Sequence, residues 1–153
     1  MVCYADADHA GDLETRKSTT GFIVMYAGGP VIWKSKRQGC ITISTYESEL
    51  VALSHAVSEV DRVIGILTDI GDKDLKPVRI YCDNQAACIA ANVDYVKPVT
   101  SRTVETRRFH VREQVQNGTI DVRRIKGEEN LADMFTKSLP AEPFCRFKKV
   151  IMK

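Results

Sequence analysis

The sequence TGFIVMYAGGPVIWKSK, residues 20–36, predicts a β-hairpin. Thr20 to Tyr26 and Val31 to Lys36 are both rich in the β-branched and aromatic residues that favour strands. The intervening Ala-Gly-Gly-Pro is a turn signal, because glycine accepts a positive φ and proline fixes the exit of the chain. A weakly alternating run, Val2 to Asp6, precedes the hairpin. We therefore expect the chain to open with three antiparallel strands.

A long amphipathic helix is predicted next, from Tyr46 to about Ile70. Its apolar residues follow one another at spacings of three and four, which places them on a single helical face. They are Leu50, Leu53, Val57, Val60, Ile64 and Leu67. Gly71 is expected to end the helix, as a glycine just after the last turn commonly does.

The second half of the chain alternates between predicted strands and helices. We expect a strand at Pro77 to Cys82, helices at Asn84 to Asn92 and Ser101 to Gln116, and a strand at Thr119 to Ile125. A final helix is expected to open near Asn130. The order βββαβααβα fits an α/β fold in which a five-stranded mixed sheet is flanked by helices.

Composition and charge limit the classes of protein to consider. The chain has 153 residues, 44% of them apolar, which is enough for one domain with a single core. Its net charge is +2, but residues 97–126 hold eight basic residues against three acidic ones. Such an uneven distribution suits an enzyme with an acidic metal site and a basic substrate track. The cysteines are odd in number and lack a C-x-x-C pair, which favours a reducing environment.

No stretch approaches the roughly 20 apolar residues of a membrane span, and the N-terminus does not have the layout of a signal peptide. We expect a soluble intracellular protein. A strand is predicted to start at once, at Val2, so we expect the chain to be a piece of a longer polypeptide.

Four acidic residues stand at the edges of predicted strands or helices: Asp6, Glu49, Asp83 and Asp133. Asp6 and Asp83 each end a strand, where ligands gather in sheets of this kind. Carboxylates crowded into one dry site repel one another unless divalent cations lie between them. The pattern indicates a phosphodiester hydrolase with paired metal ions.

Each acid also has a purely structural interpretation. Asp6 suits a solvated strand end, Asp83 a helix N-cap, and Asp133 the first turn after Asn130. An acid near a helix N-terminus is favourable in itself, which explains Glu47 as well as Glu49. Glu49 lies about 50° from the centre of the apolar stripe and Glu47 about 110°, so we expect Glu49 to face inward.

Other reactive residues show no comparable pattern. The three histidines have no metal-ligand spacing with one another or with cysteine, so a zinc site is not indicated. We expect Cys82, next to Asp83, to be a buried core thiol.

The ordered motifs of the chain resemble the ribonuclease H domain of copia-type long-terminal-repeat retrotransposon polyproteins. These motifs are Tyr4-Ala5-Asp6-Ala7-Asp8, Thr15 to Phe22, Trp33 to Lys36, Glu47-Ser48-Glu49, Tyr81 to Ala87, Val111-Arg112-Glu113, Gly118-Thr119-Ile120 and Ala132 to Lys137. The resemblance covers Val2 to about Leu139. Residues 1–139 are therefore expected to form the ribonuclease H domain. Residues 140–153 are either a C-terminal tail of that domain or a polyprotein remnant.

The resemblance implies a ribonuclease H-like fold and a two-metal site that uses Mg²⁺ or, in its place, Mn²⁺. It implies hydrolysis of the RNA strand of an RNA–DNA hybrid, giving 5′-phosphate and 3′-hydroxyl products. Asp6 would lie between the two ions, Glu49 and Asp83 mainly on one, and Asp133 on the other. The implied partners are the hybrid and the polymerase domain of the same polyprotein, in the cytoplasm or a virus-like particle.

Substrate contacts are expected from two further sets of residues. Four arginines of the predicted helix 101–116 are candidates for backbone phosphates, with a solvated helix face as the alternative: Arg102, Arg107, Arg108 and Arg112. By similarity, residues flanking two of the acids would contact the minor groove, where 2′-hydroxyls distinguish RNA from DNA: Ser44, Thr45, Asn84 and Gln85.

One departure from the family concerns the loop before Asp133. Many ribonucleases H carry a histidine there, whereas Lys126 to Asn130 contains none, as is common in copia-type members.

Two alternatives to an active ribonuclease H stay open. The chain could be a weak or inactive module that binds nucleic acid, or a related nuclease such as a DNA resolvase or an integrase core.

Overall fold

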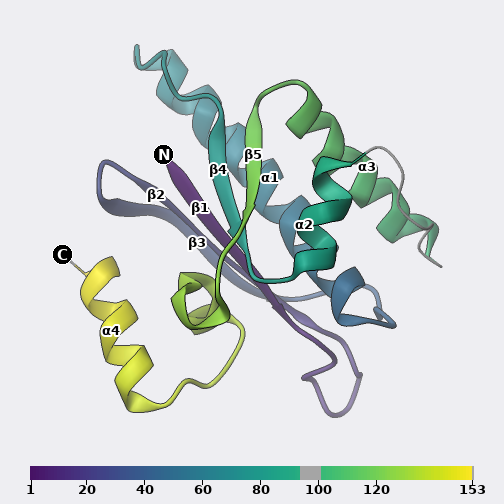
Figure 1. Ribbon diagram of the computed structural model, residues 1–153. Helices are drawn as coiled ribbons and strands as arrows, with labels where there is room; N and C mark the ends of the chain where they lie inside the picture. Colours follow the sequence, from purple (N-terminus) through teal and green to yellow (C-terminus); the bar gives the residue numbers. More distant parts are fainter. Residues whose placement is uncertain (94–100, 153) are drawn as a thin grey trace.

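The computed structural model describes residues 1–93 and 101–152 and contains a five-stranded mixed sheet with helices on both faces (Figure 1). The strands are β1 (Val2–Asp8), β2 (Thr19–Tyr26), β3 (Gly29–Arg37), β4 (Val78–Cys82) and β5 (Ile120–Arg124). The α-helices are α1 (Thr45–Asp69), α2 (Gln85–Asn92), α3 (Arg102–Gln116) and α4 (Ala141–Ile151). Two short 3₁₀ helices, η1 (Gly127–Glu129) and η2 (Leu131–Phe135), precede α4. In this described part of the chain, no helix is long and apolar enough to cross a bilayer.

The strand order in the sheet is β3-β2-β1-β4-β5. The first three strands pair antiparallel, while β1 with β4 and β4 with β5 pair parallel. This arrangement confirms the predicted mixed α/β sheet. Because β1 and β4 run side by side in the same direction, the residues at their carboxyl ends meet at one edge of the sheet.

The β2–β3 hairpin closes through a two-residue turn at Ala27 and Gly28, whose φ values are 50° and 83°. Positive φ at both turn residues matches the right-handed twist of the flanking strands. The returning strand begins at Gly29, two residues earlier than its apolar run indicates, because backbone pairing continues up to the turn.

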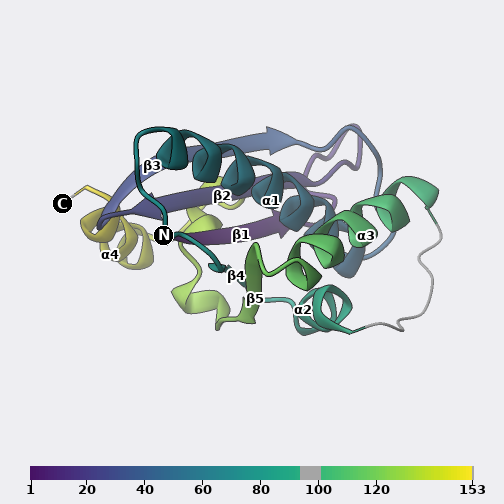
Figure 2. The ribbon, with the colours of Figure 1, turned by 90° about the horizontal axis from the view of Figure 1, so that it is seen from above.

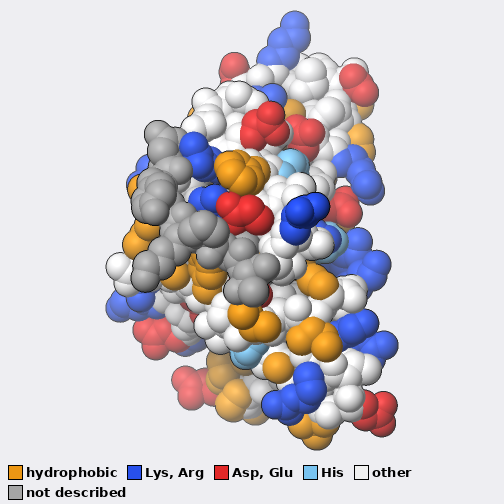
Figure 3. Space-filling view, turned by 90° about the vertical axis from the view of Figure 1, so that its right-hand side faces the viewer, with side chains coloured by type: hydrophobic (Ala, Val, Ile, Leu, Met, Phe, Trp, Pro, Cys, Tyr) orange, Lys and Arg blue, Asp and Glu red, His pale blue; other side chains and the backbone are white. Residues whose placement is uncertain are grey.

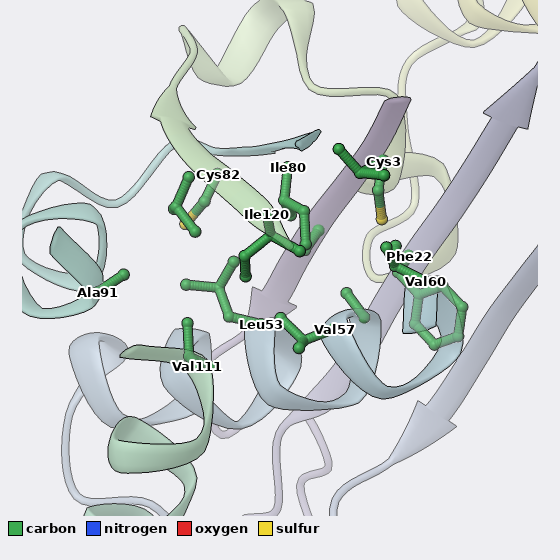
Figure 4. Packing of buried hydrophobic residues seen from close by; sticks show 14 of the residues in the cluster. Cys3, Phe22, Leu53, Val57, Val60, Ile80, Cys82, Ala91, Val111 and Ile120 are labelled. Carbon is green, nitrogen blue, oxygen red and sulfur yellow. The ribbon is translucent and has the colours of Figure 1, made fainter. Parts of the chain in front are cut away.

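The larger part of the core lies between the sheet and the layer formed by α1, α2 and α3 (Figure 2). Leu53 and Val57 of α1 face residues of the strands, among them Phe22 and Ile80 (Figure 4). The six apolar residues that predict this helix are all buried, so the predicted amphipathic helix is confirmed. Val111 of α3 also reaches this cluster, which holds α3 alongside α1 (Figure 4).

The opposite face of the sheet carries a second, smaller apolar cluster. Ile23 and Met25 of β2 pack there with Leu131 of η2 and Phe147 of α4. Burial on both faces explains why the sequence of β2 is almost continuously apolar and lacks a clean alternation.

The helix expected to open near Asn130 is the short 3₁₀ helix η2, with Asn130 as its N-cap, and not a final α-helix. The side chain of Asn130 is buried, donates a 2.9 Å hydrogen bond to the carbonyl of Ala5 and accepts one from the amide of Ala132. These bonds tie the segment to β1 at the point where η2 begins. The chain therefore makes a short 3₁₀ turn against the sheet, and the next α-helix starts only at Ala141.

Candidate active site

The four predicted acids converge at the edge of the sheet where β1 and β4 end. Asp6 lies in β1, Asp83 follows β4, Glu49 lies near the start of α1, and Asp133 lies in η2. Carboxylate oxygens of Asp6, Asp83 and Asp133 lie within 4.8 Å of one another. An oxygen of Glu49, one of Asp83 and the Sγ of Cys82 form a second such group, so Asp83 belongs to both.

Burial and mutual repulsion make this cluster costly to ionise. Asp6 is fully buried and Glu49 is 5% exposed. Burial, with the charges of Asp6 and Asp83, raises the pKa of Glu49 to about 9. Burial and Asp6 likewise raise the pKa of Asp133 to about 6, and that of Asp83 is raised by the same two causes.

A divalent cation would relieve this repulsion, and the donors suit one. Carboxylate oxygens are the ligands that Mg²⁺ and Mn²⁺ prefer in proteins. One group holds three acids, Asp6, Asp83 and Asp133, and the other holds two, Glu49 and Asp83. Together they offer ligands for more than one ion. The residues therefore fit the cofactor that the family resemblance implies.

Cys82 adds a sulfur to the acidic cluster but not a ready metal ligand. Its Sγ lies 3.6 Å from a Glu49 oxygen, to which it donates. A hydrogen bond with Cys88 and burial raise the pKa of Cys82 well above its usual value, so the thiol keeps its proton. The expectation of a buried core thiol is confirmed.

Two residues of the site were missed from the sequence: Thr136 and Lys137. The Thr136 hydroxyl donates a hydrogen bond to Asp6. The Lys137 Nζ lies 3.1 Å from Oδ1 of Asp133 and 3.3 Å from Oδ2 of Asp6. The spacing of Asp133 and Lys137, four residues apart, is a local signal for an ion pair. Nothing local connects either residue with Asp6, which is more than 100 positions away in the chain.

Gly21 provides the room for this arrangement. It pairs with Asp6 across β1 and β2, and η2 crosses directly over it. A Cβ at this position would lie 2.6 Å from Cγ2 of Thr136 and 3.0 Å from the carbonyl oxygen of Ala132. Any larger residue would therefore push η2, and Asp133 with it, away from the sheet.

The residues predicted to contact the minor groove occupy two helix N-termini beside the acids. Ser44 is the N-cap of α1 and accepts from the amide of Glu47, while Asn84 is the N-cap of α2 and accepts from the amide of Ala87. Thr45 and Gln85 are the first residues of these helices and are exposed.

Two expectations about acids at helix starts were wrong in detail. The N-cap of α2 is Asn84, so the alternative role of Asp83 as that cap does not apply. Glu47 is 3% exposed, as buried as Glu49, although its helical angle points it away from the apolar stripe. Its carboxylate accepts a 3.1 Å hydrogen bond from the amide of Ile43, which draws it against the loop before the helix. Of the two acids, only Glu49 lies in the acidic cluster.

The four arginines of α3 divide into different environments. Arg108 is 4% exposed and forms an ion pair with Glu105, so the expectation that it contacts phosphate does not fit its burial. Arg107 is half-buried, with its Nη1 3.4 Å from Nε2 of His55. Arg102 is exposed, and Arg112 is partly buried. Lys97, which belongs to the basic segment, lies outside the described residues.

Arg107 also lines a basic cleft of about 250 Å³ between β3, α1 and α3. The charged and polar side chains of this cleft are Thr20, Lys34, Lys36, Arg37, Gln38, His55 and Arg107. Burial, and to a smaller extent the charges of Arg107, Lys34 and Lys36, lower the pKa of His55. Figure 3 shows the face of the molecule on the side of α2 and α3, on which basic and acidic side chains are interspersed.

Comparison with known proteins gives this geometry its context. No family model matches the chain. It is 34% identical over 148 residues to the retrovirus-related Pol polyprotein of the tobacco transposon TNT 1-94. It is 33% identical over 153 residues to that of the Arabidopsis thaliana transposon RE1. The chain is a relative of the copia-type Pol polyproteins of retrotransposons. These matches cover 97% and 99% of the chain but only 11% and 10% of those polyproteins.

Solved structures identify the fold of this chain as that of ribonuclease H. An RNase H1 isolated from compost superposes with a TM-score of 0.65 at 17% identity, over 88% of this chain and 91% of that one. The same enzyme in complex with an RNA/DNA hybrid gives 0.63 at 14% identity, over 88% and 92%. The protease-reverse transcriptase of prototype foamy virus gives 0.52 at 16% identity, over 99% of this chain and 20% of that one. The predicted ribonuclease H-like fold is thus confirmed.

In this copia-type relative, the loop before Asp133 comes close to the acids without supplying a histidine. Gly127 of η1 lies so near that a Cβ on it would be 3.2 Å from Oδ2 of Asp83. Glu128 and Glu129 of the same turn are exposed. A basic side chain that does contact the acids is Lys137, which forms ion pairs with Asp6 and Asp133.

Proposed function

We propose that this chain is an endonuclease that hydrolyses the RNA strand of RNA–DNA hybrids during retrotransposon reverse transcription. The observation that carries the proposal is the convergence of four carboxylates at the carboxyl ends of β1 and β4 in a ribonuclease H fold. The relationship to Pol polyproteins supports the same activity.

We assign the binding of two Mg²⁺ ions, or Mn²⁺ in their place, to Asp6, Glu49, Asp83 and Asp133. Bound there, the ions would activate a water for in-line attack on the phosphorus and stabilise the leaving 3′ oxygen. This chemistry leaves a 5′-phosphate and a 3′-hydroxyl. Asp6 is fully buried and lies in one group with Asp83 and Asp133, which supports the role between the two ions that the family resemblance implies for it.

The protein itself contributes a rigid, largely dry setting for these ligands. Thr136 donates to one oxygen of Asp6, and the backbone amide of Ala7 interacts with Glu49. A carboxylate held by such bonds keeps its orientation, and pre-organised groups in a water-poor site act more strongly on charge than solvated ones. Lys137 partly offsets the negative charge on the open side of the site.

We propose that the hybrid lies across the site between the helix N-termini and the basic cleft. Ser44, Thr45, Asn84 and Gln85 stand beside Glu49 and Asp83, where a strand held at the acids would pass. The basic cleft at Arg107 offers cations to a backbone phosphate. A ribonuclease H1 with the same fold has been solved with an RNA/DNA hybrid, which supports this class of substrate.

The natural setting of the chain follows from its relatives. They are Pol polyproteins about ten times its length, and a structural neighbour is a protease-reverse transcriptase. We therefore propose that a polymerase domain of the same polyprotein is its working partner, in the cytoplasm or a virus-like particle.

A cleavage assay tests the proposal. The purified chain is incubated with an RNA–DNA hybrid, single-stranded RNA and double-stranded DNA of the same sequence, in Mg²⁺ and in Mn²⁺. We expect the RNA of the hybrid to be cut, and Asp83→Asn to lower the rate at least about a thousandfold, as the loss of a central charge in a metal site does. Asp121→Asn is the matched control, because Asp121 lies on β5 and pairs with Arg123.

Three outcomes would count against the proposal in different ways. An intact hybrid in both metals, with retained hybrid binding, would favour the alternative of an inactive binding module. Cutting of double-stranded DNA in preference to the hybrid would indicate a resolvase-like or integrase-like nuclease. Equal rates for Asp83→Asn and the natural chain would remove Asp83 from the site.

A further inference from the structure

Lys137 brings a positive charge into direct contact with two of the four acids. Its Nζ lies 3.1 Å from Oδ1 of Asp133 and 3.4 and 3.3 Å from the two oxygens of Asp6. The backbone holds the residue there as well, because the amide of Lys137 donates a 3.0 Å hydrogen bond to the carbonyl of Asp133. The ammonium group therefore bridges β1 and η2.

We propose that Lys137 is a built-in cation of the site, which holds Asp6 and Asp133 together and competes with a divalent ion for their oxygens. The inference rests on the proposed two-metal function and assigns unequal affinities to its two ions. The ion held mainly by Glu49 and Asp83 binds more tightly. The ion on the Asp133 side must displace the lysine ammonium.

The inference rests on which of the four acids Lys137 contacts. Lys137 contacts Asp6 and Asp133 but no oxygen of Glu49 or Asp83 within ion-pair distance. The positive charge of an ammonium repels a divalent ion at the same oxygens, and the repulsion is stronger where water is scarce. The competition is therefore strongest on the Asp133 side of the site, whereas the charge of Lys137 acts on Glu49 and Asp83 only from a longer distance.

The burial of the acids separates this contact from an ordinary surface ion pair. Exposed pairs contribute little to stability because water screens both charges. Here the Asp6 side chain is 1% exposed, whereas that of Lys137 is 41% exposed. Asp6 gains a compensating charge that it cannot obtain from solvent. The flexible stem of Lys137 has open space into which it can withdraw when an ion takes its place.

The test measures metal binding, not cleavage. Protein stripped with a chelator is titrated with Mn²⁺, and free Mn²⁺ is followed by electron paramagnetic resonance for the natural chain, Lys137→Met and Lys137→Arg. Lys73→Met is the matched control, since Lys73 is exposed in the loop before β4 and its loss changes the net charge equally. We expect the natural chain to bind one Mn²⁺ tightly and a second weakly.

Lys137→Met should tighten the second ion by the order of tenfold, because a charge in contact with the ligands is removed. Lys137→Arg and Lys73→Met should stay within about twofold of the natural chain, since each keeps the charge at the site. In chelator, Lys137→Met should also unfold a few degrees lower than Lys73→Met, and added Mn²⁺ should abolish that difference.

The outcomes separate this inference from the proposed function. Two bound ions with the same affinities in the natural chain and in Lys137→Met would overturn the inference and leave the two-metal hydrolase intact. A second ion that binds more weakly to Lys137→Met would also overturn it, because the lysine would then assist the ion. If neither protein binds Mn²⁺, both the inference and the proposed metal site are wrong.

Discussion

Thr136 donates a hydrogen bond from its hydroxyl to Asp6, a residue 130 positions earlier in the chain. The bond joins the turn after η2 to the central strand of the candidate site. It also fixes one oxygen of a carboxylate that is fully buried. The orientation of Asp6 therefore depends on a residue that is not itself among the metal ligands proposed here.

Replacing Thr136 with valine keeps the shape of the side chain and removes the hydroxyl. A hydrogen bond to a charged group contributes about 1.5–3 kcal/mol, so we expect hybrid cleavage to fall by roughly tenfold or more. The measurement is the cleavage rate at saturating Mg²⁺. Thr68→Val is the control, because the Thr68 hydroxyl bonds only to the carbonyl of Ile64 within α1. Equal rates for the two variants would show that Asp6 is oriented without Thr136.

The close approach of η2 to β2 predicts that Gly21→Ala is damaging. The added methyl would lie 2.6 Å from Cγ2 of Thr136 and 2.9 Å from Cβ of Phe135, so η2 must shift. We expect a loss of about 1–3 kcal/mol in the free energy of unfolding, together with weaker cleavage because Asp133 moves. Thermal or denaturant unfolding gives the first value and the hybrid assay the second.

Gly65→Ala is the matched control for Gly21→Ala. Gly65 lies in α1 with open space around its Cβ position. Alanine there should stabilise the protein by about 0.5–1 kcal/mol, because it lowers the entropy of the unfolded chain. If both alanines stabilise, the packing of η2 over Gly21 is looser than the structure indicates.

The regular elements of this fold are readable from the sequence because local patterns determine them. The apolar spacing of α1 and the Gly-Gly turn of the hairpin act within a few residues, and both predictions were correct. The convergence of Asp6 and Asp83 follows from strand order, which the βββαβ pattern implies. Glu49 and Asp133 were selected by their places at the edges of predicted helices, and the family resemblance then assigned all four acids to one metal site.

The turn that carries Asp133 is different, because long-range bonds decide its form. Asn130 is a good helix N-cap by sequence, yet its bond to Ala5 ties the segment to the sheet and a 3₁₀ turn results. Long-range packing also decides the environments of Arg108 and Lys137. The charge and helical position of Arg108 are visible in the sequence but its burial is not, and nothing in the sequence places Lys137 against the buried Asp6.

The raised pKa of Glu49 predicts how the metal-free protein responds to pH. Burial and nearby carboxylates raise its pKa from the ordinary 4.5 to about 9 in the folded state. The folded protein therefore binds a proton more tightly than the unfolded chain, and its stability should fall as the pH rises from about 4.5 to 9. Asp133 should add to this fall between about 4 and 6. Thermal unfolding in chelator across pH 5–9 measures the effect.

Glu49→Gln should flatten this pH dependence, since the amide does not titrate. Mg²⁺ should raise the unfolding temperature of the natural chain more at pH 8 than at pH 5, because protons and the metal compete for the same oxygens. A natural chain that is equally stable across this range in chelator would mean that Glu49 has an ordinary pKa.

Neighbouring arginines of α3 should have separable roles. Arg107 lines the basic cleft, so Arg107→Ala should weaken hybrid binding and lower the slope of log affinity against log salt by about 1. Arg108 is buried and forms an ion pair with Glu105, so Arg108→Ala should instead cost about 2 kcal/mol of folding stability by removing that ion pair and the packing of the buried side chain. Binding is measured by filter retention at several salt concentrations, and unfolding by denaturant.

Arg62→Ala serves as a control for charge alone, because Arg62 is exposed on α1 and pairs only with Glu59. Its loss should change neither the salt slope nor the stability noticeably. A salt slope that changes equally for Arg62→Ala and Arg107→Ala would show that the basic cleft is not a phosphate contact.

The C-terminal segment is predicted to be part of the folded domain and not a detachable remnant. Phe147 of α4 is 4% exposed and packs with Ile23, Met25 and Leu131 on the face of the sheet opposite α1. Phe147→Ala should therefore lower the free energy of unfolding by about 3 kcal/mol. Phe144→Ala, on the same helix but 44% exposed, should change it by less than about 1 kcal/mol.

Truncation after Leu139 should expose the same apolar face and promote aggregation. If Phe147→Ala and the truncated chain unfold as the full chain does, residues 140–153 are a remnant that the ribonuclease H fold does not need.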